Sequence, residues 1–168
     1  MNKNPPISRS FFFLENETAL PLGGEDVLSV EKGIIVHQVN CKKVMGAGLA
    51  KQLSEKFPQI RKKYLAKENW NLGDTQFVKI HNELFVCNLA GQFDYGRKRK
   101  LYTDYGALQI GFKKVNLFAL KNNLDIFLPY FLGCGLARGH WDIVYSLIDY
   151  YLNSPSYDCF ICKIKEKK

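Results

Sequence analysis

Short apolar runs alternate with longer amphipathic segments along the chain. The run at 33–39, GIIVHQV, is rich in β-branched residues and has the length of a buried strand. Over 49–57 apolar residues recur at helical spacing, and Pro58 is expected to stop or restart that helix. The runs at 75–80 and 84–90 are separated by HNE, which predicts two strands joined as a hairpin.

The second half of the chain repeats this order of elements. Thr103 is expected to cap a helix whose apolar residues share one face and which ends near Asn122. An apolar run from Asp125 predicts a strand, a helix with one apolar side follows over 141–152, and 157–165 predicts a last strand. Helices that alternate with apolar strands indicate an α/β fold with a mostly parallel central sheet and antiparallel additions.

A Gly-x-Gly loop lies between a predicted strand and a predicted helix at two places, Gly46 with Gly48 and Gly133 with Gly135. Glycine lets the backbone adopt positive φ and approach a ligand, and the free N–H groups and dipole of a helix N-terminus attract an anion. A tight turn also collects glycine without binding anything, but two such loops could hold one diphosphate from both sides. No lysine followed by Ser or Thr closes either loop, which disfavours a P-loop NTPase. Lys51 stands where a dinucleotide-binding loop has its third glycine.

Composition is that of an ordinary globular protein. The chain has 168 residues, 46% hydrophobic and 24% charged, and its formal net charge of +8 favours anionic ligands such as nucleotides or nucleic acid. Five cysteines at irregular spacing do not form a disulfide framework, so we expect a reducing compartment. The apolar run near the start, FFFL, is too short for a signal sequence or a membrane span. These features predict a single-domain cytoplasmic protein with no membrane partner.

Four ordered motifs resemble those of the macrodomain family, the ADP-ribose-binding fold. They are IVHQVNCKKVMGAGLAKQL at 35–53, GD at 73–74, NLAGQFDYGRKRKLYTDY at 88–105 and LPYFLGCGLARGHW at 128–141. They are most similar to the branch that contains ADP-ribose-1″-phosphate-processing proteins and terminal ADP-ribose glycohydrolases. The resemblance implies a three-layer α/β/α macrodomain with a mixed, mostly parallel central sheet over 24–168, preceded by an N-terminal extension or first strand over 1–23.

The resemblance also implies which residues bind the ligand. Asn40 would contact the distal ribose, the loop at 46–48 would form the first diphosphate site, and the loop at 133–137 would close over phosphate and ribose. Asp26, or alternatively Glu25, would accept the adenine amino group. The implied ligand-binding residues are Asp26, Asn40, Gly46, Ala47, Gly48, Leu49, Gln92, Gly133, Cys134, Gly135, Leu136 and Ala137.

Two positions depart from the glycohydrolase pattern. In those enzymes a lysine after the strand at 84–90 attacks the ribose and an acid in the second loop assists it, whereas this chain has Gly91 or Gln92 and Ala137 there. The chain is therefore more similar to the processing proteins, which implies hydrolysis of a group from the distal ribose by water, without a cofactor. ADP-ribose-1″-phosphate is the first-choice substrate. The alternatives are a hydrolase that removes ADP-ribose from protein or nucleic acid, and a non-catalytic reader of ADP-ribose.

Hydrolysis needs a base that activates water, and two histidines are candidates. Strand alternation places Gln38 and Asn40 on one face and His37 on the other, so His37 is expected in the core or behind the site. His140 stands at the entrance to the last predicted helix, whose N-terminus would keep the imidazole neutral and able to accept a proton. The alternative for His140 is a surface or capping role. We predict Asn40 and His140 as the catalytic residues.

The cysteines are weaker candidates for chemistry. Cys41 and Cys134 flank the two glycine loops, but the sequence places no histidine beside either, so both are expected to be structural. Cys159 and Cys162 lie on a predicted strand at a spacing that puts them on opposite faces, and no second pair or histidine completes a zinc site. We expect no metal.

The segment FDYGRKRKLYTDY interleaves aromatic residues with four consecutive basic ones at 97–100. This pattern is typical of a nucleic-acid-binding loop and, more often, of a solvated charged loop. Beside the expected pocket, its basic side chains would contact phosphates of the ligand or a macromolecule to which ADP-ribose is attached. Tyr95 or Phe93 would stack on a sugar or base, or simply pack.

Overall fold

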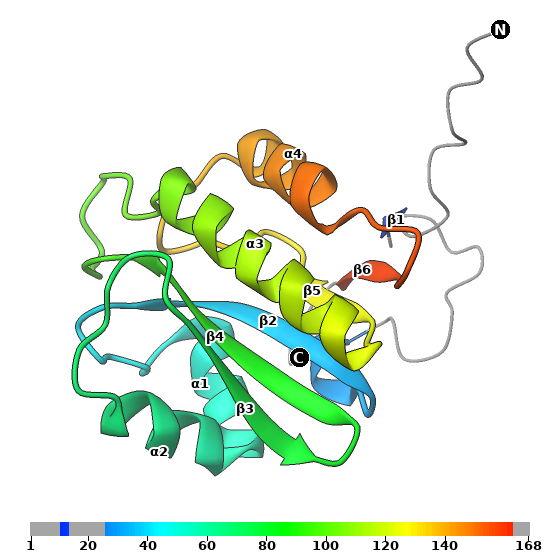
Figure 1. Cartoon of the computed structure of the whole chain (residues 1–168). Coiled ribbons are helices and arrows are strands. Elements are labelled where there is room, and N and C mark those ends of the chain that lie inside the picture. Colours follow the sequence, from blue (N-terminus) through cyan, green and yellow to red (C-terminus); the bar gives the residue numbers. More distant parts are fainter. Residues whose placement is uncertain (1–10, 14–25, 163–168) are drawn as a thin grey trace, which may run out of the picture.

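A six-stranded sheet forms the centre of the computed structural model, which describes residues 11–13 and 26–162 (Figure 1). The strand order is β1-β6-β5-β2-β4-β3, and every neighbouring pair is parallel except β3 with β4. The predicted boundary between 23 and 24 lies outside the described residues. The elements are β1 (Phe11–Phe13), η1 (Val27–Ser29), β2 (Gly33–Asn40), α1 (Gly48–Lys56), α2 (Pro58–Ala66), β3 (Thr75–His81), β4 (Leu84–Gln92), α3 (Tyr105–Asn122), β5 (Ile126–Pro129), α4 (Trp141–Leu152) and β6 (Cys159–Cys162).

Helices cover both faces of the sheet. Figure 1 shows α1 and α2 on one face and α3 and α4 on the other. One buried cluster joins α3 and α4 to the sheet through residues such as Phe112 and Ile148. A second cluster joins η1, α1 and α2 to the opposite face through Leu53 and Ile60. This arrangement confirms the predicted three-layer α/β/α fold, and the antiparallel β3 and β4 form the predicted hairpin.

Helix boundaries follow the local sequence at two of the predicted points. Phe57 ends α1 and also precedes α2, which begins at Pro58. Proline is tolerated at the first position of a helix because its missing N–H would have no helical partner there. Asn123, with φ of 51°, ends α3 in the left-handed conformation, close to the predicted end.

The predicted cap of α3 is wrong by one residue. Asp104 is the N-cap, and its Oδ1 accepts a hydrogen bond of 2.7 Å from the N–H of Ala107. Thr103 instead forms an isolated antiparallel bridge with Gln92, so its backbone belongs to the sheet edge. Its hydroxyl donates to the carbonyl of Gly133 at 2.6 Å. The Thr103 hydroxyl, which the local pattern predicted would cap the helix, therefore bonds to a residue distant in the sequence.

Three parallel strands end side by side, which positions the site. β5, β2 and β4 are consecutive in the sheet and end at Pro129, Asn40 and Gln92. The segment 130–140, which contains the second glycine loop, connects β5 to α4, and α4 begins at Trp141 as predicted. Ligands of open α/β sheets bind outside the carboxyl ends of such strands, where the loops leave room.

Candidate ligand-binding site

A cavity of about 520 Å³ opens at the carboxyl ends of β2, β4 and β5, a volume sufficient for a nucleotide-sized ligand. All of the predicted ligand-binding residues line it except Asp26 and Cys134. The lining comes from four parts of the chain: residues 37–40, residues 44–50, Gln92 with Tyr95 to Arg97, and the segment 129–137 without Cys134.

The first glycine loop leads into α1, as predicted. Ala47 is the N-cap, α1 begins at Gly48 with φ of 57°, and the first helical hydrogen bond runs from the N–H of Lys51 to the carbonyl of Ala47. A Cβ added at Gly46 or Gly48 would meet no other atom within 4 Å. Only Gly48 needs a left-handed φ, so neither conformation nor packing explains Gly46.

Asn40 organises the approach to this loop. Its Nδ2 donates to the carbonyl of Val44 at 2.7 Å, and its Oδ1 accepts from the N–H groups of Lys42 and Val44 at 3.1 and 3.2 Å. The hydroxyl of the buried Tyr64 donates to the carbonyl of Asn40. Asn40 lines the cavity, so it can meet a ligand with its second Nδ2 hydrogen while the rest of its amide holds the turn. Sequence reasoning missed Tyr64 because an apolar-face tyrosine on a helix gives no sign of such a bond.

Gln38 connects the end of β4 to the second glycine loop through Thr103, a role that sequence reasoning missed. Its Nε2 donates to Oε1 of Gln92 at 2.8 Å and to Oγ1 of Thr103 at 3.0 Å. The hydroxyl of Thr103 in turn donates to the carbonyl of Gly133. A Cβ at Gly91 or Gly133 would lie only 2.5 or 2.6 Å from Oε1 of Gln38. These two glycines therefore leave room for the Gln38 side chain, together with Leu108 at Gly91 and Thr103 at Gly133.

The second glycine loop is held by its own backbone. The N–H of Cys134 donates to the carbonyl of Phe131, and the N–H of Gly139 donates to the carbonyl of Gly133, both at 2.8 Å. A Cβ at Gly135, in contrast, would meet nothing within 4 Å. Gly135 thus resembles Gly46, since open space rather than packing surrounds it.

Cys134 contributes to this loop without facing the cavity. Its Sγ lies 3.3 Å from the carbonyl of Leu132 and packs against the core under α3 and α4. Burial raises the pKa of the thiol to about 11, so the group stays protonated at neutral pH. The side chain is therefore structural, as expected for the thiol, and the predicted contact of Cys134 with the ligand stays a prediction.

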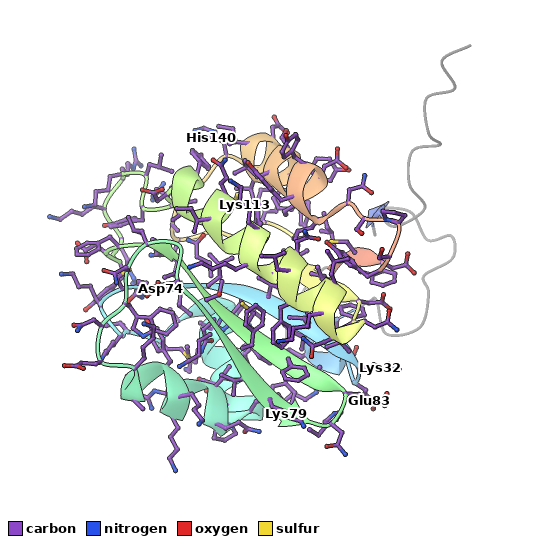
Figure 2. The ribbon with its side chains drawn as sticks, viewed as in Figure 1. Lys32, Asp74, Lys79, Glu83, Lys113 and His140 are labelled. Carbon is purple, nitrogen blue, oxygen red and sulfur yellow. The ribbon has the colours of Figure 1, made fainter. Side chains whose placement is uncertain are left out.

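Two other predicted residues lie away from the cavity. Asp26 caps the short helix η1, where its Oδ1 accepts from the N–H of Leu28 at 2.9 Å. His140 is exposed at the start of α4, at the edge of the molecule in Figure 2, and its N–H donates to the hydroxyl of Tyr105. The helix entrance predicted for His140 is correct, but the ring does not line the cavity.

His37 is buried, as strand alternation indicates, and it also reaches the cavity wall. Its Nε2 lies 2.5 Å from Oδ1 of Asn88 on the adjacent strand, which makes Nε2 the donor. Among the described residues, no group donates to its Nδ1. Burial lowers the pKa of His37 to about 4, because the charged imidazolium would lose its water. The ring is therefore neutral at physiological pH.

An aromatic wall closes the cavity on the β5 side. Tyr130 and Phe131 both line it, with their ring centroids 4.3 Å apart and their planes at 77°. Phe131 has φ of 62° and its side chain is 47% exposed. A bulky residue in the left-handed region costs about 1–2 kcal/mol, and such strain is concentrated at ligand sites. The sequence signal was the pair of aromatics between a strand and a glycine loop.

The cavity is positively charged, and few ionisable side chains line it. Among the described lining residues, Arg97 is the only Lys or Arg, and none is Asp or Glu. Within the ranges 11–13 and 26–162, no group of three or more His, Cys, Asp or Glu could hold a metal ion. In the same part of the chain, no helix has both the length and the hydropathy to cross a bilayer. The described lining can attract and hold an anion, and it supplies no carboxylate base.

Comparison with known proteins places the chain in a family. No family model matches the sequence. The chain is 30% identical over 128 residues to an uncharacterized 17.5 kDa protein in the tk-vs intergenic region of Enterobacteria phage T4, a match covering 70% of this chain and 78% of the phage protein. A macrodomain protein from Streptomyces coelicolor has a TM-score of 0.68 at 24% identity, over 85% of this chain and 97% of that one. The chain belongs to the family of the phage protein and has the macrodomain fold.

A second structural neighbour of this macrodomain is DarTG from Thermosipho africanus, solved in complex with ADP-ribose. Its TM-score is 0.69 at 20% identity, over 85% of this chain and 41% of that one. In this macrodomain Gln92 and Ala137 both line the cavity. The glycohydrolase pattern expects a lysine at Gly91 or Gln92 and an acid at Ala137; of these three residues Gln92 and Ala137 line the cavity, and none is a lysine or an acid.

Proposed function

We propose that this macrodomain binds ADP-ribose with the diphosphate between its two glycine loops. The observation that carries the proposal is the pair Gly46 and Gly135, one from each loop, both lining one cavity with open space where a Cβ would stand. Neither residue has a positive φ, so close approach of a ligand to the backbone is the remaining reason for glycine. The ADP-ribose bound in the T. africanus neighbour supports this choice of ligand.

The N-terminus of α1 supplies the anion site. The helical hydrogen bonds begin at the N–H of Lys51, so the N–H groups of 48–50 have no partner within the helix. All three of these residues line the cavity. Free N–H groups and the helix dipole together favour a diphosphate at this position. Tyr130 and Phe131 lie at the β5 side of the same cavity, where they offer apolar faces to the adenine.

The distal ribose is assigned to the β4 side of the cavity. Asn40 and Gln92 are paired across β2 and β4, and both line this part. Arg97 follows Gln92 in the same loop and brings a cation to the rim. A phosphate on the distal ribose would find its charge complement there, because a guanidinium binds phosphate through charge-assisted hydrogen bonds. This supports ADP-ribose-1″-phosphate as the preferred substrate.

Hydrolysis in this site proceeds by direct attack of water. With neither Lys nor Asp nor Glu among the described lining residues, the cavity offers no lysine nucleophile and no carboxylate base. One water adds across the C1″–O–P linkage, which yields ADP-ribose and inorganic phosphate. The backbone donors and Arg97 stabilise the negative charge without reorganising, while Asn40 holds the ribose. The ring of His140 does not line the cavity, so the predicted role of His140 as the base is left to be tested with a His140 variant.

Two measurements test this function. Calorimetry should give micromolar or tighter binding of ADP-ribose, about 8 kcal/mol or more, and far weaker binding of AMP, which lacks the second phosphate and the ribose. Phosphate release from ADP-ribose-1″-phosphate should be catalysed and should fall in Asn40→Ala more than binding does. Equal affinities for ADP-ribose and AMP would contradict the two-loop site. Binding without turnover of any substrate would identify a reader instead of an enzyme.

A further inference from the structure

The outer faces of α3 and α4 carry large apolar side chains. Figure 1 shows the two helices side by side over one face of the sheet, and their inner faces are buried against it. Leu117 on α3 is 66% exposed and Tyr150 on α4 is 78% exposed, so packing of the core explains neither residue. The outer patch consists of five exposed residues that do not line the cavity: Ile110, Leu117, Leu120, Ile143 and Tyr150.

The outer patch is continuous across the two helices. On α3, Leu117 and Leu120 are three positions apart, which places them on one face of the helix. The ammonium of Lys113, one turn before Leu117 and labelled in Figure 2, lies 5.5 Å from the ring centre of Tyr151 on α4. The Tyr151 ring centre lies 4.8 Å from that of Tyr150. Isolated exposed apolar residues are ordinary, but a continuous apolar patch marks an interaction site.

A basic edge borders the outer patch on α3. This helix contains three lysines and no acidic residue. The ammonium of Lys114 donates to the carbonyl of Gly73 at 3.0 Å, in the turn before β3. Because β3 is the edge strand far from β5 and β6, this bond places Lys114 on the side of α3 away from α4. Lys121 follows Lys114 after about two helical turns, so it lies on the same side.

An acidic edge borders the outer patch on α4. This helix contains Asp142 and Asp149 and neither Lys nor Arg. Tyr151 marks the side of α4 that faces α3, and the two aspartates lie about 180° and 160° around the helix from it. Both carboxylates are therefore on the side away from α3. Within residues 11–13 and 26–162, no ion pair that the structure shows involves either helix, so neither edge is neutralised by one.

We propose that the outer patch binds the same patch of a second copy, and that the protein is a dimer with its two-fold axis over the seam between α3 and α4. A two-fold rotation exchanges the sides of the face, so the basic edge of each copy meets the acidic edge of the other. The rotation also reverses the helix direction, which brings Lys121 opposite the partner's Asp142. Lys114 then meets the partner's Asp149. The two lysines and the two aspartates have the same spacing along their helices, about 10.5 Å, so both pairs form together.

A second copy fits this face better than a different partner does. A protein of another sequence would cover the outer patch, but it would not require equally spaced opposite charges on the two edges of one face. An anionic membrane surface would repel the acidic edge. The inference goes beyond the proposed function, because no residue of the outer patch or of its two edges lines the cavity.

Charge reversal with complementation tests the pairing of the edges in the full chain. Asp142→Lys/Asp149→Lys gives a face with two basic edges, and Lys114→Glu/Lys121→Glu gives a face with two acidic edges. Sedimentation velocity from about 1 to 500 μM should show a reversible dimer of the unmodified protein and a dissociation constant at least about tenfold higher in either variant. An equimolar mixture of the two variants should restore the dimer, because every basic edge then meets an acidic one. Each variant exchanges only two residues in a chain of formal net charge +8, so both stay positive overall and net attraction does not explain the recovery.

Leu117→Arg tests the apolar centre, and Leu65→Arg is its matched control. Leu65 is 42% exposed on α2, which covers the opposite face of the sheet. Leu117→Arg should raise the dissociation constant of the dimer at least about tenfold, because it buries a charge at the centre of the interface. Leu65→Arg should change it by less than about twofold. Thermal melting should show that both variants are folded, since both side chains are exposed.

The outcomes separate this inference from the proposed function. ADP-ribose affinity, measured by calorimetry, should stay within about threefold in all four variants, because none of the substituted residues lines the cavity. An unmodified protein that stays monomeric at about 500 μM would overturn the dimer. A dimer that folded Leu117→Arg leaves intact, or a mixture of folded charge variants that stays monomeric, would overturn the assigned interface. Loss of ADP-ribose binding in the unmodified dimer would instead overturn the proposed function alone.

Discussion

Gly46 offers a substitution that should abolish ligand binding while sparing the fold. Its φ is ordinary and a Cβ there would meet nothing within 4 Å, so a larger side chain has room in the empty cavity. Replacing glycine where the conformation suits other residues reduces the entropy of the unfolded chain and stabilises a protein by about 0.4–1 kcal/mol. We therefore expect Gly46→Glu to melt at the same temperature as the unmodified protein or slightly above it.

The effect on binding has the opposite sign and is larger. A carboxylate about 5 Å from a phosphate, at an effective dielectric constant of about 20–80, repels it by about 1–3 kcal/mol. That is a loss of about 5- to 200-fold in affinity for each phosphate that faces the new charge. The neutral Gly46→Gln has nearly the same volume, so the difference between the two variants measures the charge alone.

Gly48 provides the internal comparison within the same loop. Its φ of 57° is left-handed, so Gly48→Ala should lower the free energy of unfolding by about 1 kcal/mol even without ligand. Thermal melting with and without ADP-ribose, followed by calorimetry, reads out all three variants. A retained ligand-induced shift in folded Gly46→Glu would refute the assignment of this loop to the diphosphate. Loss of the fold in Gly46→Glu would refute the argument that the position is open.

Three further predictions follow from the packing and charge of the site. Folded His37 has a pKa near 4 against an ordinary value of 6.5, so the unfolded state takes up the proton first as pH falls. The free energy of unfolding should therefore drop by about 3 kcal/mol between pH 6.5 and 4. Denaturant titrations should show this drop in the control variant His81→Gln, whose substituted residue is exposed, but not in His37→Gln. Gly133→Ala should destabilise the protein by about 2 kcal/mol or more, because its φ is 70° and the new Cβ would lie 2.6 Å from Oε1 of Gln38; differential scanning calorimetry that shows no loss would contradict this packing. Reductive trapping with an ADP-ribosylated substrate should give no lysyl adduct by mass spectrometry, because Gly91 and Gln92 stand where the nucleophilic lysine is expected, and a trapped adduct would exclude direct attack by water.

The parts of this macrodomain that local pattern encodes could be predicted from the chain alone. A buried strand, an amphipathic helix and a restart at Pro58 each depend on residues within a few positions of one another. The first glycine loop follows for the same reason, since Gly46 and Gly48 stand directly between β2 and α1. Alternation along β2 also placed His37 correctly in the interior.

Predictions from the local pattern were wrong where a side chain forms a hydrogen bond with a residue distant in the sequence. Thr103 looked like a helix cap, but its hydroxyl bonds to Gly133, 30 positions away. Gln38 looked like an ordinary strand residue, and its partner Thr103 is 65 positions away. The position of His140 outside the cavity depends on the path of 130–140 over the sheet edge, which has no periodic signal.

The sequence by itself determined the class of fold, the positive charge and the two glycine loops, because helical and strand periodicity and glycine content act over short distances. Only the tertiary structure decided which glycines are free to meet a ligand. Gly46 and Gly135 face open space, whereas Gly91 and Gly133 leave room for Gln38. All four are glycine, so the residue type alone does not separate the two roles. The distinction lies in what surrounds each Cα, which is set by strands and loops that meet only after the sheet has formed.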